Sequence, residues 1–234
     1  MVNPRDIVIP QGAASDNLTN YEIGAKGRWL DGRISANLAL YWIDWKNIQV
    51  QANRVSDSLQ FATNIGAATS KGVELEMHVI PIRGLTLGLS ASYDSAHVTE
   101  LTADQAAISG AVVGARLSSP ELQGSVTSRY DFEMSSGMQG NVEVDVEHVG
   151  SFPNQFPNVP GAPTTIAPSY GYSDTYNNVN AALGIKKDRL TVTGYVENVF
   201  NNHSFIYVHP EEFVASRYGI LRPRTVGIRL GYDF

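Results

Sequence analysis

The chain has 234 residues, no cysteine and a formal net charge of -6. The lack of cysteine excludes disulfide bonds, thiolate metal sites and cysteine nucleophiles, and the acidic balance gives no sign of a nucleic-acid partner. No run approaches the roughly 18 consecutive apolar residues of a membrane-spanning helix. The mean hydropathy of -0.14 fits alternating membrane strands as well as it fits a soluble protein.

Apolar and polar residues alternate with period two along the whole chain, which predicts strands and not helices. In the first such stretch, 20–30, Tyr21, Ile23 and Trp29 share one parity, while Glu22 has the other. The alternation recurs in stretches 33–42, 71–80, 85–93, 122–132, 141–149, 179–185, 190–200 and 224–234. We therefore expect an all-β antiparallel meander of about nine strands.

Short and long connections alternate between these strands. The short joins lie near 31–32, 81–84, 134–139 and 186–188. The long joins, of about twenty residues, lie near 51–70, 99–117, 150–174 and 201–222. Outer-membrane barrels have short periplasmic turns and long extracellular loops. The connections therefore favour a transmembrane β-barrel whose odd-numbered strands run inward, although a soluble β-sandwich would also show alternating strands.

The aromatic residues support this orientation, because outward-facing rings collect at the two membrane interfaces. Rings of the apolar parity lie late on inward strands, at the expected periplasmic rim, and late on outward strands, at the outer rim. The periplasmic set is Trp29, Tyr130, Phe132, Tyr232 and Phe234, and the outer set is Trp42 and Tyr93. Trp45 has the opposite parity, so we expect it to face the lumen or to follow a bulge.

The last strand ends on an aromatic ring. Its apolar residues, at every second position back from the terminus, are Val226, Ile228, Leu230, Tyr232 and Phe234. This pattern resembles the C-terminal signature of bacterial outer-membrane barrels, which the barrel-insertion machinery reads as a membrane-insertion signal. The alternative is an ordinary C-terminal edge strand, which would be an aggregation hazard without a partner.

Four stretches make the chain resemble the C-terminal part of a TonB-dependent outer-membrane receptor. They are "NYEIGAKGRWLDGRISANLALYWIDWKNIQVQ", "NIGAATSKGVELEMHV", "LTVTGYVENVFNNHSF" and "RPRTVGIRLGYDF", in the family's order and spacing. The resemblance implies that residues 1–234 form the last nine strands of a 22-stranded β-barrel. It also implies that the plug domain and signal peptide are absent, and that the isolated chain is an open, incomplete barrel.

The resemblance further implies a location in the outer membrane of a Gram-negative bacterium and a role in energy-coupled import. The expected ligand is a ferric siderophore. The other implied partners are outer-membrane lipid, the insertion machinery and the TonB system, which would act through the missing plug; no cofactor and no nucleic acid is expected. A passive porin and a soluble carbohydrate-binding β-sandwich are the alternative functions.

Few residues suggest a site. Glu143, Asp145 and Glu147 share the lumen-facing parity and could attract cations or bind Ca²⁺, or could pair with wall arginines or the plug. His203 and His209, in the last long loop, could touch an iron chelate or could be solvated. The stretch 151–172, rich in proline and aromatic residues, is expected to be an irregular outer loop over the pore. Catalytic motifs such as Gly-x-Ser-x-Gly and His-Glu-x-x-His do not occur, so we expect no enzyme.

Overall fold

The computed structural model describes residues 9–54, 59–209 and 217–234, and nine of its strands form one antiparallel sheet. The sheet contains β1 (Asn17–Trp29), β2 (Ile34–Arg54), β3 (Leu59–Val79), β4 (Leu85–Glu100), β5 (Leu122–Glu133), β6 (Gln139–Val149), β9 (Tyr176–Lys187), β10 (Leu190–Glu197) and β13 (Thr225–Tyr232). Each strand pairs with the next of these along the chain. The predicted nine-stranded antiparallel meander is therefore confirmed.

The connections hold the remaining elements. These are helix α1 (Ala103–Ser109), the short 3-10 helix η1 (Ser135–Gly137), and two small sheets, β7 (Asn158–Val159) with β8 (Ala162–Ile166) and β11 (Phe205–Val208) with β12 (Tyr218–Ile220). Within the described ranges, no helix is both long and apolar enough to cross a membrane.

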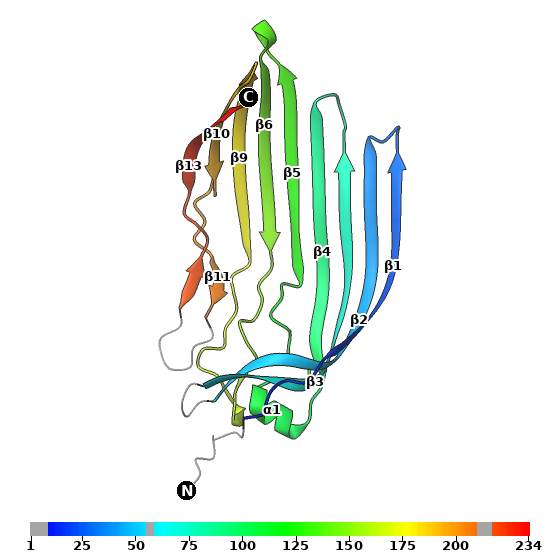
Figure 1. The fold of residues 1–234 in the computed structure, drawn as a ribbon, viewed down its shortest axis with the longest axis vertical. Coiled ribbons are helices and arrows are strands. Elements are labelled where there is room, and N and C mark those ends of the chain that lie inside the picture. The colour runs from blue at the N-terminus through cyan, green and yellow to red at the C-terminus, as the bar shows by residue number, and fades with distance from the viewer. Residues whose placement is uncertain (1–8, 55–58, 210–216) are drawn as a thin grey trace.

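The two ends of the sheet differ, as Figure 1 shows. The short turns, η1 and the C-terminus lie at one end, which we call the turn end. Helix α1 and residues 9–16 lie at the other, the loop end, where the long connections gather. There, the last part of β2 and the first part of β3 bend across the end of the sheet toward α1 (Figure 1). The predicted segregation holds for the long connections after β4, β6 and β10, but the predicted long loop between β2 and β3 is a paired hairpin.

The first predicted long loop, 51–70, is wrong. Strand β2 continues to Arg54 and β3 begins at Leu59, with pairing from Ala52↔Phe61 to Trp45↔Ala68. Residues 55–58 of the predicted loop lie outside the described residues. Beyond the apolar part of the sheet, both faces of a hairpin can be polar, so the alternation that marks the rest of the strands fades here.

The other long connections also differ from the prediction. The stretch 151–172 is not an irregular loop, because it contains the β7–β8 hairpin. The connection at 99–117 contains α1, which begins with a capping box between Thr102 and Gln105. The connection at 201–222 contains β11 and β12, while its residues 210–216 lie outside the described residues. Each long connection therefore carries local structure that period-two alternation does not reveal.

The register places the predicted apolar residues on one face. Tyr130 pairs with Val142, Val142 with Leu183, Leu183 with Gly194, and Gly194 with Ile228. Directly opposed residues point to the same side of a sheet, so this row crosses five strands on one face. The large apolar side chains of that face are exposed, Ile228 by 74%. The apolar face of the sheet is therefore uncovered, as a surface that faces lipid would be.

The opposite face is polar and is not covered by a second sheet. On this face, Arg129 lies opposite Glu143, and Thr127 lies opposite Asp145. The two small sheets lie at the loop end, and in the described part of the chain no sheet packs face to face against the nine strands. The alternative of a soluble β-sandwich is thus contradicted, since a sandwich needs two packed sheets. Strands β1 and β13 each have one described neighbour, so the sheet is open as expected.

Candidate functional site: the polar wall and the loop-end cluster

The loop-end limit of the apolar face lies at Trp42. The Lys71 Nζ atom lies 3.9 Å from the Trp42 ring centroid, and the Trp42 indole donates a hydrogen bond to Asp44 at 2.9 Å. Lys71 lies directly opposite Trp42, and Asp44 follows it on the same face. The apolar part of β2, from Ile34 to Trp42, is 9 residues long, and a strand that crosses a bilayer needs about 9–11 residues. The change from apolar to charged residues marks the expected outer interface.

The other predicted girdle residues lie on the apolar face of their strands. Tyr93 is in the middle of β4, opposite Val73, and Trp29 is the last residue of β1, at the turn end. The rings of Tyr130 and Phe132 stack at the turn end of β5, with centroids 5.8 Å apart. All are on the apolar face, in two groups along the strands. Their contact with membrane interfaces remains a prediction.

The proposed insertion signal is the exposed edge of the sheet. Its five residues, Val226, Ile228, Leu230, Tyr232 and Phe234, are all more than half exposed on the apolar face. The Tyr232 and Phe234 rings meet edge to face, with centroids 5.3 Å apart. This arrangement leaves the residues accessible to a receptor or to a neighbouring strand, but recognition by insertion machinery remains a prediction.

Glu143 on the polar wall forms an ion pair with Arg129, its cross-strand neighbour. Arg129 also contacts Asp131 on its own strand, at 2.8 Å from Nη2 and 3.0 Å from Nε. One guanidinium therefore joins two carboxylates on β5 and β6. The structure agrees with the expectation that Glu143 is a paired wall charge.

Asp145 and Glu147 form no ion pair with any residue that the structure describes. Asp145 lines a hollow with Arg229, whose guanidinium carbon lies 5.5 Å from the Tyr195 ring centroid. Alternate positions on one strand are about 6.6 Å apart, too far for three carboxylates to share one ion. The described residues contain no group of three or more His, Cys, Asp or Glu side chains that could hold a metal ion.

The two candidate histidines lie at the loop end but in different surroundings. His203 is exposed between β10 and β11. His209 follows β11, is half-buried, and its ring meets Tyr207 edge to face with centroids 6.0 Å apart. The structure therefore does not bring them into one cluster, and ligand contact by either remains a prediction.

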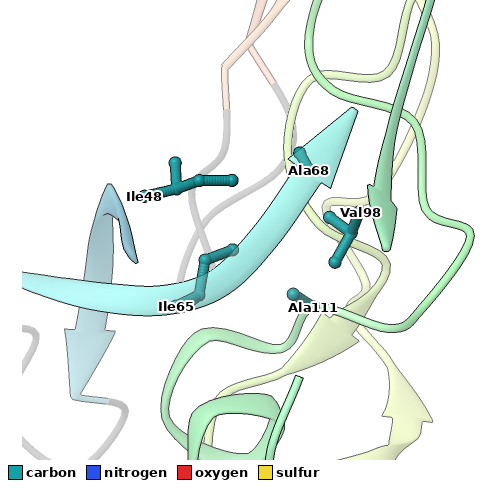
Figure 2. Packing of buried hydrophobic residues seen from close by; sticks show 5 residues of the cluster. All are labelled: Ile48, Ile65, Ala68, Val98 and Ala111. Atoms are coloured by element: carbon teal, nitrogen blue, oxygen red, sulfur yellow. The ribbon is translucent and has the colours of Figure 1, made fainter. Parts of the chain in front are cut away.

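A small hydrophobic core at the loop end was not predicted. Ile48, Ile65, Ala68, Val98 and Ala111 are almost fully buried and pack together (Figure 2). They come from β2, β3, β4 and the segment after α1. Trp45, Val50, Leu117 and Phe156 are among the residues that pack around them. We call this group the loop-end core; it confirms that Trp45 turns away from the apolar face.

Hydrogen bonds fix the bent end of the β2–β3 hairpin to the segment before β1. The Asn64 carboxamide accepts from the Ala14 amide at 2.6 Å and donates to the Ala14 carbonyl at 2.9 Å and the Asn47 carbonyl at 2.7 Å. Asn47 donates to the Ser15 carbonyl at 2.6 Å, and the Trp45 indole donates to Asp16 at 2.8 Å. Asn47 has φ of 54°, a left-handed conformation that asparagine tolerates, and it lies at the bend.

Helix α1 is fixed to the β7–β8 hairpin in the same region. Gly110 ends the helix with φ of 70°, and its carbonyl accepts from the Asn158 amide at 3.0 Å. A side chain at position 110 would collide with the Asn158 backbone. In the connection after β8, burial raises the pKa of the Tyr170 hydroxyl to about 12. The hydrogen bond from this hydroxyl to Tyr172 also raises the pKa. The connections at the loop end are therefore joined by specific contacts.

A cavity of about 460 Å³ opens beside the loop-end core. Its lining comes from β2, β3, α1, β11 and the segments before β5 and around β7. Sequence reasoning could not find it, because residues from six separate segments form it. One local signal was available: the Thr-Ala-Asp-Gln sequence at 102–105 is a capping box and could have indicated α1.

Comparisons with known proteins agree with this geometry. The sequence model of the family "TonB dependent receptor-like, beta-barrel" matches residues 16–199. The chain is 39% identical over 61 residues to the ferric-pyoverdine 358 receptor of Pseudomonas putida. The aligned stretch covers 25% of this chain and 7% of that receptor.

Two solved structures show the same fold. The ferric yersiniabactin uptake receptor FyuA from Yersinia pestis has a TM-score of 0.72 and 20% identity, with 94% of this chain and 30% of that chain covered. The ferripyoverdine receptor of the Pseudomonas aeruginosa outer membrane has a TM-score of 0.67 and 20% identity, with 94% and 27% covered. This chain thus spans less than a third of their length. The match to the family model covers most of the chain, so the protein belongs to the TonB-dependent receptor β-barrel family.

Proposed function

We propose that this chain is the C-terminal part of the barrel of an outer-membrane receptor that imports a ferric siderophore with energy delivered through TonB. The match to the receptor-barrel family over residues 16–199 carries the proposal. The curated relative and the solved structures named above are receptors for ferric ligands. Family membership also locates the sheet in the outer membrane of a Gram-negative bacterium.

The arrangement of the sheet supports this role. Its uncovered apolar face suits lipid, and its charged face suits a water-filled lumen or a plug domain that contacts the wall. Both edge strands can pair with further strands of a longer protein, and the exposed apolar residues of β13 can serve the insertion machinery. The family consists of transport receptors, and we infer that the chain contributes to transport and not to catalysis.

Uptake of radioactive iron by iron-starved cells tests the proposal. Cells with the intact receptor gene should accumulate iron from at least one ferric siderophore in a panel, and cells without the gene should not. Dissipating the proton gradient of the inner membrane should stop uptake within minutes, because the outer membrane has no energy source of its own. Uptake that continues in de-energised cells would instead indicate a passive porin, and uptake that does not depend on the gene would refute the proposal.

A further inference from the structure

The cavity at the loop end, which we call the loop pocket, differs from the rest of the concave surface in its charge. None of the described residues that line it is an Asp, Glu, Lys or Arg. By contrast, a hollow of about 990 Å³ on the polar wall near the turn end is lined by four basic and three acidic side chains. These are Arg83, Arg129, Lys186, Arg229, Asp131, Glu133 and Glu143. The lack of charge is therefore a local property of the loop pocket.

The rim of the loop pocket carries neutral polar groups that are available to a ligand. Gln51, Gln60 and Ser118 line it, and their side chains form no hydrogen bond within the described part of the chain. All three residues are exposed. Carboxamides and hydroxyls both donate and accept hydrogen bonds without carrying charge. They can therefore bind amide, hydroxamate or hydroxyl groups.

The floor and one side of the loop pocket are apolar and supported. Val50, Leu117 and Phe156 line the pocket and also pack against the loop-end core. Tyr207 and His209 also line the pocket, and their rings meet edge to face. Pockets of about 300–1,000 Å³ with an apolar floor, aromatic walls and a few convergent polar groups bind small molecules. The support from the core keeps the pocket formed without a ligand.

We infer that the loop pocket binds an uncharged, hydrogen-bonding part of the imported ligand and disfavours polyanionic ligands. A neutral peptide, hydroxamate or sugar group would exchange its hydrogen bonds with water for bonds to the rim and would pack against Phe156 and Tyr207. A polyanion would lose hydration without gaining a positive partner. The inference rests on the proposed function, because it assigns a ligand class to the same import process.

Binding measurements on the purified full-length receptor test the inference. The probes are a charge-neutral ferric trihydroxamate and a triply negative ferric tricatecholate, with an iron-free neutral oligosaccharide and an iron-free, end-blocked neutral peptide. The neutral ferric complex should bind at least about tenfold more tightly than the anionic one. Replacing two neutral hydrogen-bonding side chains with Gln51→Leu and Gln60→Leu together should weaken neutral binding about fivefold to tenfold.

An added positive charge and a matched control sharpen the result. Gln60→Lys should narrow the preference for the neutral complex, because it supplies the missing positive partner. Gln139→Leu, the same substitution at the turn end, should leave both dissociation constants within about twofold. Equal or tighter binding of the anionic complex by the unaltered receptor, or unchanged neutral binding after the double substitution, would overturn the inference.

The iron-free probes separate this inference from the proposed function. If no ferric siderophore of the panel enters energised cells, the proposed siderophore import fails. Binding of the neutral peptide or oligosaccharide that the double substitution weakens would then still support the ligand class of the pocket. Of these two probes, the one that binds would identify the source of the neutral groups. If no probe binds to the receptor, the inference fails, and the panel of ferric siderophores then decides the proposed function.

Discussion

Single residues explain two of the motifs that resemble the receptor family. Gly72 lies in the Lys-Gly-Val-Glu stretch of β3, and the ring of Tyr41 lies across it. A side chain at Gly72 would also approach the Tyr93 carbonyl oxygen to 2.5 Å, so the position requires close contact between strands. The second motif contains Asn198, which is buried and has φ of 51°. Its carboxamide bonds to the backbone at Asn202 and Arg222, which fixes the end of β10.

The facing of neighbouring residues on β13 gives the first prediction. Ile228 is exposed on the apolar face, whereas Arg229 lies on the polar wall near Tyr195. We expect Ile228→Arg to impair membrane insertion of the full-length receptor, because an arginine near the bilayer midplane costs about 2–4 kcal/mol. Arg229→Ile should have a much smaller effect. Urea titration of the two variants folded in lipid vesicles measures the difference, and equal destabilisation would contradict the assigned facing.

At the scale of elements, the bent β2–β3 hairpin organises the loop end. Its core residues Ile48 and Ile65 contribute to the loop-end core, and its bend holds the segment before β1 through Asn64. A hairpin that protrudes without support would leave these apolar side chains in water, at about 1.5–3 kcal/mol each. The hydrogen bonds at the bend therefore act together with hydrophobic burial to keep the hairpin over the end of the sheet.

Removing the carboxamide of Asn64 tests this role. Asn64→Ala should raise the hydrogen-exchange rate of the Ala14 amide about tenfold or more and lower the unfolding free energy by about 1–3 kcal/mol. Asn64→Asp keeps the acceptor for the Ala14 amide but removes two donated bonds, so its effect should be intermediate. Asn37→Ala, which removes one exposed hydrogen bond to Glu76 at 3.3 Å, is the control. Unchanged protection of Ala14 in Asn64→Ala would show that the core alone fixes the bend.

The sequence predicts the elements well wherever one face is apolar. The alternation of apolar and polar residues predicts all nine strands of the main sheet and the side to which Trp45 points. The alternation arises because one face of the sheet meets lipid and the other meets water. The continuation of β2 to Arg54 and the start of β3 at Leu59 were missed, since outside the bilayer neither face must be apolar. Helix α1 was missed because seven residues are too few to show a helical period. The loop pocket was missed because its polar residues converge only in the folded chain.

At the scale of the whole molecule, the two ends of the sheet define an orientation. The short turns and C-terminus lie at the turn end, and helix α1 and residues 9–16 lie at the other (Figure 1). The loop-end core and the loop pocket are formed by segments at the loop end. If the protein imports a ligand from outside, the loop end must face the medium. The carboxylates and arginines of the wall then line the route below it.

Site-directed labelling tests this orientation, and the chain itself contributes no cysteine. Two matched sites for single cysteines are Val113, which is 62% exposed at the loop end, and Ser135, in the turn η1. Each is introduced into a full-length receptor from which all other cysteines have been removed. A bulky maleimide that does not cross the outer membrane should label Val113→Cys in intact cells. Ser135→Cys should react only after the outer membrane is permeabilised, and both should react equally after denaturation. The reverse pattern would place the loop pocket in the periplasm, where it could not capture an external ligand.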